Sequence, residues 1–211
     1  MINFSKTQNQ NSDLAKIKKA LLSGKLEGGG KFSQKACEKL NKLGYRNNLL
    51  TTSCTSALEM SAILLDLKEG DEIIMPSYTF VSTANAFLLK GCVPVFVDVH
   101  KDDLNINAAK IEEAISPKTK AIVVVHYGGV SCDMEKILKI AKKNKLYLVE
   151  DAAQCINAFY NSTPLGSIGN LGALSFHNTK NISSGEGGAL IVNDNKFYKR
   201  AKIVHEKGTN R

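Results

Sequence analysis

The chain contains 211 residues, of which 43% are hydrophobic and 23% are charged, with only 4 prolines. This is an ordinary globular composition with enough chain for one large core, so we expect a single domain. The formal net charge of +8 raises the question of nucleic-acid binding, but the lysines are spread along helix-like stretches such as residues 16–19 and 142–145. No RNA-binding, zinc or basic-zipper pattern accompanies them. We therefore expect no nucleic-acid partner and a mild preference for anionic small molecules.

The cysteines are odd in number and show no CxxC spacing. They are Cys37, Cys54, Cys92, Cys132 and Cys155. Neither a disulfide framework nor a metal site is predicted, and a reducing cytoplasm fits best. The chain starts without a hydrophobic signal core, and no apolar run approaches the ~18 residues that a membrane span needs. We accordingly expect a cytoplasmic protein with no metal and no membrane association.

Two helices are predicted within an N-terminal helical segment, residues 1–45. Apolar residues recur at helical spacing in both, at Leu14, Ile17, Leu21 and Leu22 and again at Ala36, Leu40 and Leu43. Gly24 and Gly44 end the two helices, and Ser33 is the predicted N-cap of the second. The connecting residues 24–31 include three consecutive glycines, which suit either a loop around a ligand or flexibility alone.

A strand, a turn and a helix follow in succession. Residues 48–51 are predicted as the strand, residues 52–56 as a turn rich in hydroxyl groups, and residues 57–65 as an apolar-periodic helix. Free backbone N–H groups and the positive end of the helix would then point at one spot and form a cup for an anion. A plain Ser/Thr helix cap is the alternative, and it is the commoner use of such residues.

From residue 70 onward, short β-branched runs alternate with amphipathic stretches. The predicted strands are residues 72–75, 93–97, 121–125 and 146–149, and the predicted helices are residues 81–90, 108–115 and 134–143. Such alternation predicts an α/β fold with a mainly parallel sheet covered by helices on both faces. Residues 48–51 and 172–176 add two strands, and residues 189–192 add an antiparallel neighbour. We therefore predict a mixed sheet of seven strands, followed by a helix at residues 195–206.

Polar residues follow these strands, at the edge where ligands of parallel sheets bind. They fall in residues 52–55, 76–80, 126–129, 150–154 and 177–180. Among them, Lys180 lies between two apolar runs. Burial would lower the pKa of its amine and make it a nucleophile able to form a Schiff base. Taken alone, the alternative is a loop lysine that caps a strand.

Three motifs together resemble one family. Residues 150–154 (EDAAQ), residues 175–180 (SFHNTK) and residues 185–188 (GEGG) are similar to those of the pyridoxal-phosphate-dependent sugar-nucleotide aminotransferases of the DegT/StrS type. The resemblance covers essentially the whole chain. It implies the large domain of the aspartate-aminotransferase fold, called fold type I. Within the family, residues 52–55 and 76–86 are most similar to members that convert dTDP-4-dehydro-6-deoxyglucose to dTDP-4-amino-4,6-dideoxygalactose.

The resemblance implies a role for each of seven residues. Lys180 would be the Schiff-base lysine, and Asp151 the carboxylate that keeps the pyridine nitrogen of the cofactor protonated. Phe80 would stack on the pyridine ring, and Gln154 would donate a hydrogen bond to its 3-oxygen. The phosphate would be held by Cys54, Thr55 and Ser175. Many relatives carry glycine in place of Cys54, so this residue would act through its backbone N–H and not its thiol.

The reaction that the resemblance implies has two halves. L-Glutamate would give its amino group to the cofactor, with Lys180 as both anchor and general base. The second half would aminate the C4 ketone of a nucleotide sugar, for lipopolysaccharide, O-antigen or common-antigen synthesis. A homodimer is implied as the working assembly. The side chains of His126, Tyr127 and His177 lie near the predicted rim and receive no role, because a histidine after a core strand is as often structural.

Two alternatives remain at this point. Sugar dehydratases on the same fold replace the lysine with histidine, and Lys180 argues against them. The other alternative is a truncated, catalytically incompetent or regulatory relative that folds and binds cofactor only. The family continues with a smaller C-terminal domain beyond the point that matches residue 211. We therefore expect residues 1–211 to form the large domain, to bind cofactor weakly alone, and to act on a sugar nucleotide only when the missing segment is supplied.

Overall fold

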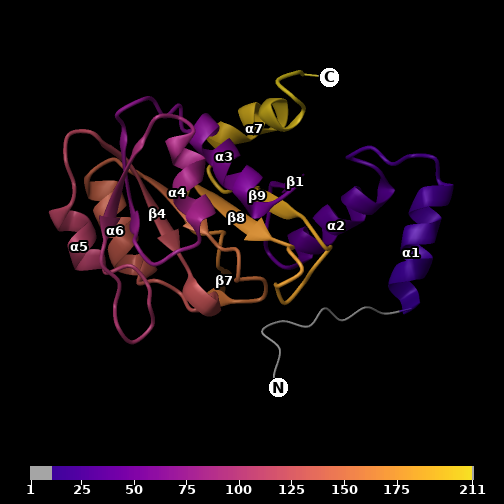
Figure 1. The fold of residues 1–211 in the computed structure, drawn as a ribbon, viewed down its shortest axis with the longest axis horizontal. Coiled ribbons are helices and arrows are strands. Elements are labelled where there is room, and N and C mark those ends of the chain that lie inside the picture. The colour runs from indigo at the N-terminus through magenta and orange to yellow at the C-terminus, as the bar shows by residue number, and fades with distance from the viewer. Residues whose placement is uncertain (1–10, 211) are drawn as a thin grey trace.

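The central feature of the computed structural model, which describes residues 11–210, is a seven-stranded sheet (Figure 1). Its strand order is β1-β9-β8-β5-β4-β2-β3. The strands are β1 (Asn48–Thr51), β2 (Glu72–Pro76), β3 (Val93–Val97), β4 (Thr119–Val125), β5 (Tyr147–Asp151), β8 (Leu171–Ser175) and β9 (Gly188–Val192). The β8-β5-β4-β2-β3 portion is parallel, whereas β9 runs antiparallel to both β8 and β1. The predicted mixed sheet of seven strands is confirmed.

Helices cover both faces of this sheet (Figure 1). The described helices are α1 (Asn11–Leu22), α2 (Lys31–Lys42), α3 (Cys54–Leu64), α4 (Val81–Leu88), α5 (Ala108–Glu113), α6 (Met134–Lys143) and α7 (Tyr198–His205), with 3-10 turns η1 (Tyr127–Gly129) and η2 (Asn195–Phe197), and all but α1 pack against the body. Apolar residues of α3, α4 and α7 share one core with the sheet, and those of α5 and α6 share another. A third cluster joins α2 to the loop after β5. Both faces are therefore buried, as the continuous apolar strands predict.

Alternate residues of the central strands belong to different cores on the two faces of the sheet. Val123 and Val149 belong to the α3–α4 side, whereas Val124 and Leu148 belong to the opposite side. Successive side chains of a strand point to opposite faces, so adjacent residues at the end of β5 must also diverge. The same rule therefore sends two neighbouring acidic residues, Glu150 and Asp151, into different surroundings.

Helix starts differ from the sequence-based predictions at two places. The second helix begins at Lys31, because the Gln34 amide already donates to the Gly30 carbonyl at 3.0 Å, so Ser33 lies inside it and is not its N-cap. The third helix begins at Cys54, three residues earlier than predicted. Its N-cap is Ser53, whose hydroxyl accepts the Ser56 N–H at 3.1 Å. The hydroxyl-rich turn is thus the first turn of the helix itself.

Two further elements were not anticipated in their observed form. Strands β6 (Phe159–Tyr160) and β7 (Thr163–Pro164) make a small antiparallel hairpin, too short to leave a periodic signal. Helix α1 has no buried residue and stands apart from the body in Figure 1.

Between residues 11 and 210, no helix is long and apolar enough to cross a membrane. Residues 1–10 of the predicted N-terminal segment lie outside the described part.

Glu150, near the carboxyl end of β5, is a fully buried acidic residue with several hydrogen bonds. Its Oε1 accepts the N–H groups of Ile168 and Gly169, both at 2.6 Å. Its Oε2 accepts the N–H of Gly166 at 2.7 Å and contacts His126 Nε2 at 3.0 Å. Four donors therefore surround one carboxylate, which offsets the cost of burying its charge.

We predict that Glu150→Gln lowers the free energy of unfolding by about 3 kcal/mol. Each Glu150 oxygen accepts from two donors. In the glutamine variant one of these oxygens is replaced by an NH2 group, which cannot accept, so two buried donors lose their acceptor. Urea unfolding measures the change.

The matched control is Glu135→Gln, which removes only an exposed ion pair with Lys139 and should change stability by less than about 0.5 kcal/mol. Equal stability of both variants would contradict the structural role of Glu150.

Candidate active site

A cavity of about 700 Å³ opens at the carboxyl ends of the parallel strands. Its lining includes every residue that the sequence singled out: Cys54, Thr55, Phe80, Asp151, Gln154, Ser175 and Lys180. Asp151 ends β5 and Ser175 ends β8, while Cys54 and Thr55 open α3. Segments up to 126 residues apart in sequence thus meet because parallel strands end at one edge.

Asp151 is held at the base of the cavity, with 6% of its surface exposed. Its Oδ2 accepts the Thr83 hydroxyl at 2.7 Å, and its Oδ1 accepts the Ala153 N–H at 3.2 Å. The Cys54 thiol approaches Oδ1 at a longer 3.9 Å. A carboxylate offers about four lone-pair sites, so at least one remains for a further donor.

Burial is the main influence on the charge of Asp151. It raises the pKa of the carboxyl above its ordinary value, and the Thr83 hydroxyl, the Ala153 N–H and the Lys180 amine act in the opposite direction. Burial, reinforced by Asp151, raises the pKa of the Cys54 thiol well above its ordinary value. That thiol is therefore a poor nucleophile, which leaves its backbone N–H as the useful group.

The start of α3 supplies backbone donors to the cavity, because the first N–H groups of a helix have no partner within it. Ser53, Cys54 and Thr55 line the cavity there. The approach of β9 requires glycine, since a Cβ on Gly188 would lie 2.4 Å from the Ser53 carbonyl carbon and 2.5 Å from the Cys54 nitrogen. The glycine-rich motif therefore brings β8 and β9 directly against the helix end, and the site has the geometry of an anion cup.

Lys180 comes from the loop that joins β8 to β9. Its backbone N–H donates to the His177 carbonyl at 2.9 Å, and the loop is closed by the Phe176 N–H, which donates to the Gly187 carbonyl at 2.8 Å. The lysine is half-buried and not enclosed, because β8 ends at Ser175 and β9 begins only at Gly188. It shares the cavity with Asp151, toward which its amine exerts an electrostatic effect.

Phe80 and Gln154 lie at the more open part of the cavity. Phe80 precedes α4 and is 73% exposed, so one face of a bound ring is free to lie against it. The Gln154 Oε1 accepts the Gly128 N–H at 2.6 Å. This bond fixes the amide orientation and leaves the Nε2 group as a donor.

The three residues without a predicted role are now distinguishable. The ring of His126 is buried, with Nδ1 accepting the Cys132 N–H at 3.2 Å and Nε2 facing Glu150, so it is structural. Tyr127 packs against Tyr78 at the rim in a tilted arrangement, with ring centroids 4.9 Å apart and hydroxyl oxygens 3.0 Å apart. His177 Nε2 lies 3.4 Å from Glu186 at the mouth. Sequence reasoning missed Thr83, whose only signal is a hydroxyl in the first turn of α4.

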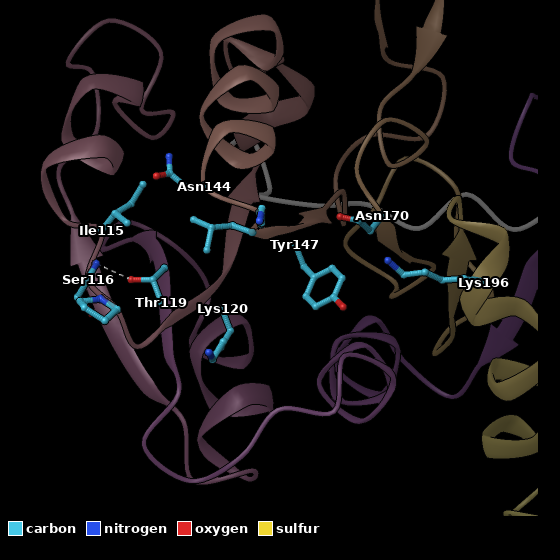
Figure 2. Close-up of a pocket in the computed structure, with 11 residues that line it drawn as sticks. Ile115, Ser116, Thr119, Lys120, Asn144, Tyr147, Asn170 and Lys196 are labelled. Atoms are coloured by element: carbon cyan, nitrogen blue, oxygen red, sulfur yellow. Dashed lines mark hydrogen bonds between the residues drawn. The ribbon is translucent and has the colours of Figure 1, made fainter.

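A second hollow, of about 860 Å³, lies around the amino ends of β4 and β5 (Figure 2). Two of its polar side chains are engaged within the chain: Asn170 accepts the Leu148 N–H and donates to Asp194, and Thr119 accepts the Ser116 N–H. None of the residues that the sequence singled out lines it. Across residues 11–210, no cluster of three His, Cys, Asp or Glu side chains is arranged to hold a metal ion.

The fold and the site define an α/β protein of the aminotransferase type, with a lysine and a carboxylate on one cavity. Residues 7–211 match the model of the DegT/DnrJ/EryC1/StrS aminotransferase family, and the chain belongs to this family. This confirms the family that the motifs predicted.

Individual relatives agree with that result. GDP-perosamine synthase of Caulobacter vibrioides is 36% identical over 165 residues, which are 78% of this chain and 44% of that protein. The crystal structure of DesI, determined in the presence of its TDP-sugar product, superimposes with a TM-score of 0.91 at 30% identity, over all of this chain and 54% of that one. The structure of NtdA of Bacillus subtilis, with the cofactor PMP bound, superimposes with a TM-score of 0.84 at 34% identity, over 92% of this chain and 45% of that one.

This chain therefore spans about half the length of the relatives that it matches. The cofactor expected from the sequence is confirmed for the family, whose aminotransferases depend on pyridoxal phosphate. Substrates belong to the proposal that follows.

We predict that Gly188→Ala lowers the free energy of unfolding by about 2 kcal/mol, because its new methyl group would overlap the backbone that opens α3. Gly28→Ala is the control, since a Cβ there meets nothing within 4 Å. Thermal unfolding compares the two. A neutral Gly188→Ala would mean that β9 does not press against the helix end.

Proposed function

We propose that the protein is a pyridoxal-phosphate-dependent aminotransferase that moves an amino group from L-glutamate to the C4 ketone of a nucleotide-linked 4-dehydro-6-deoxy sugar. The observation that carries the proposal is the convergence of Lys180, Asp151 and the amino end of α3 on one cavity. An amine, a buried carboxylate and an anion cup are the three groups that this chemistry requires.

The residues fit the cofactor on chemical grounds. The N–H groups of Cys54 and Thr55 suit its phosphate, with the Ser175 hydroxyl beside them where β8 ends against Gly188. The Thr55 hydroxyl donates to Ser82 at 2.8 Å, so the Thr55 side chain is already oriented. When bound, the cofactor supplies an electron sink for the carbon that loses its proton.

Lys180 has two tasks in this proposal. It first holds the cofactor covalently through its amine. Once free, the same amine would serve as the general base that accepts the proton lost by the amino donor. Its place on the β8–β9 loop, half-buried and facing the cavity, suits a side chain that must move between these positions.

Asp151, Phe80 and Gln154 set the surroundings of the ring. The carboxylate of Asp151 has bonding capacity left for a ring N–H, which would also stabilise its own charge against the effect of burial. Phe80 provides the stacking face. The Gln154 Nε2 group, freed as a donor by the bond to Gly128, suits the ring oxygen.

For the substrate we propose dTDP-4-dehydro-6-deoxyglucose, with dTDP-4-amino-4,6-dideoxygalactose as product, in the synthesis of lipopolysaccharide or related surface sugars. The TDP-sugar product of DesI supports the TDP carrier, whereas the name of GDP-perosamine synthase supports a GDP carrier. Amination assays with both nucleotide forms decide between them.

We further propose that the described residues form the large domain and that two copies assemble as a homodimer. Exposed apolar side chains at the mouth, Phe80 and Val81 among them, support a covered surface there. Sedimentation velocity tests the assembly, and a purely monomeric protein would contradict it.

We predict that Lys180→Ala abolishes the visible absorbance that pyridoxal phosphate acquires when bound to the lysine, together with glutamate turnover, because no other cavity group can replace the covalent link. Absorbance spectroscopy and 2-oxoglutarate formation measure both effects. The control is Lys118→Ala, an exposed lysine remote from the cavity, which should match the unmodified protein. An unchanged band in Lys180→Ala would refute the lysine's role. Bound cofactor without transfer in the unmodified protein would favour either a cofactor-binding, regulatory relative or a need for the segment that the longer relatives have.

We predict that Asp151→Asn retains cofactor but transfers amino groups at least about 100-fold more slowly, since it removes the charge that keeps the ring protonated while preserving size. Single-turnover reaction with L-glutamate gives the rate, and equilibrium titration gives the cofactor affinity. Asp133→Asn, at the N-cap of α6, is the matched control. Near-normal turnover in Asp151→Asn would show that another group protonates the ring.

A further inference from the structure

Two threonines connect Asp151 to the cavity by a second route. Thr83 lies in the first turn of α4 and has no solvent exposure. Its hydroxyl donates to Asp151 Oδ2 at 2.7 Å, and the Thr79 hydroxyl lies 2.7 Å from the Thr83 oxygen. Thr79 is half-buried and lines the cavity. The three side chains form a continuous row of short hydrogen bonds.

The direction of this row follows from the number of protons. A hydroxyl has one hydrogen to donate, and an ionised carboxylate can only accept. Thr83 therefore donates to Asp151 and must accept from Thr79. If Asp151 were protonated at Oδ2 and donated to Thr83, the carboxyl would no longer accept the Thr83 hydroxyl. The observed row, in which Thr83 donates, therefore favours the ionised carboxyl.

Other groups around Asp151 are accounted for. Lys180 faces it from the β8–β9 loop, the Cys54 thiol from α3 and Cys155 from the turn after β5. The ring of His126 is bound to Glu150, which points to the other face of the sheet. Among the groups that favour the ionised form, the Thr83 hydroxyl has the largest effect and Lys180 a smaller one.

We propose that Thr83, oriented by Thr79, is the positioning residue that fixes the Asp151 carboxylate and favours its ionised form before any ligand arrives. Its hydroxyl is buried and donates to the carboxylate at short distance. The effect on Asp151 is a property of the chain alone. The consequence for amino transfer rests on the proposed function.

The first experiment measures Asp151 directly, in protein without cofactor, by carbon-13 NMR of labelled aspartate carboxyls at varied pH. Loss of one resonance in Asp151→Asn identifies the signal. Thr83→Val keeps the shape but removes the hydroxyl, so the pKa of Asp151 should rise by about one unit. Thr83→Ser keeps the hydroxyl, so its Asp151 titration midpoint should lie close to that of the unmodified protein.

Two further variants separate positioning from general packing. Thr119→Val is the matched control, because this buried threonine also contacts a carboxylate, Glu72, but at the opposite edge of the sheet. It should leave the Asp151 midpoint unchanged. Thr79→Val removes the outer hydroxyl of the row and should raise the midpoint by a smaller amount. This half-buried site also keeps the test valid if Thr83→Val folds poorly. A midpoint that stays within about 0.2 units in both Thr83→Val and Thr79→Val overturns the proposal.

The second experiment adds pyridoxal phosphate and L-glutamate. Thr83→Val should slow the single-turnover rate about tenfold with little change in KM for glutamate, and Thr83→Ser should recover it. If the unmodified protein binds no cofactor, the proposed function fails while the NMR result still decides the role of Thr83. If the Asp151 midpoint shifts but the single-turnover rate does not change, Thr83 influences Asp151 only in the protein without cofactor, and its proposed part in amino transfer is overturned.

Discussion

The site depends on the buried carboxylate of Glu150. Three backbone N–H groups of the loop before β8 and the ring of His126 converge on it, so it ties that loop and the turn after β4 to the end of β5. Loops that surround an α/β site are ordinarily the mobile parts of such folds. Here a fully bonded charge holds the turn after β4, whose His126 lines the cavity, against the loop before β8, which lies outside the lining. An incompletely bonded carboxylate would cost several kcal/mol, so Glu150 fixes the framework behind this part of the cavity.

The neighbouring residue shows how a strand divides structural and chemical work. Asp151 points to the α3–α4 side because the strand alternates, and there it meets Thr83 and Cys54 but keeps free bonding capacity. Glu150 is saturated with donors, whereas Asp151 is not. Two adjacent carboxylates thus differ in the number of donors around each and in the bonding capacity left for a ligand.

Periodicity predicted the seven strands, their mainly parallel arrangement and the rim where Lys180, Asp151 and Gln154 meet, because these depend on local alternation and one topological rule. It did not predict the start of α3 at Cys54, since capping by Ser53 depends on a hydrogen bond that composition cannot reveal. It also missed Thr83 and the full role of Glu150. Both act through contacts between segments distant in sequence, 68 residues apart for Thr83 and Asp151. Their residue types are common in helices and strands, so no pattern distinguishes them.

The cofactor side and the mouth of the cavity are built with different rigidity. Asp151, Gln154 and the start of α3 are fixed by bonds to backbone N–H groups or by the helix itself. At the mouth, Tyr78 and Tyr127 come from two different loops and are joined by a hydroxyl contact and a tilted ring contact. The hydrogen bond between the two hydroxyls raises the pKa of Tyr127. Such a pair can adapt to what it contacts, because breaking it costs only about 1–2 kcal/mol. Under the proposed function, this framework would serve one cofactor chemistry while the mouth contacts the part of the substrate that varies, so the sequence indicates the family more readily than the substrate.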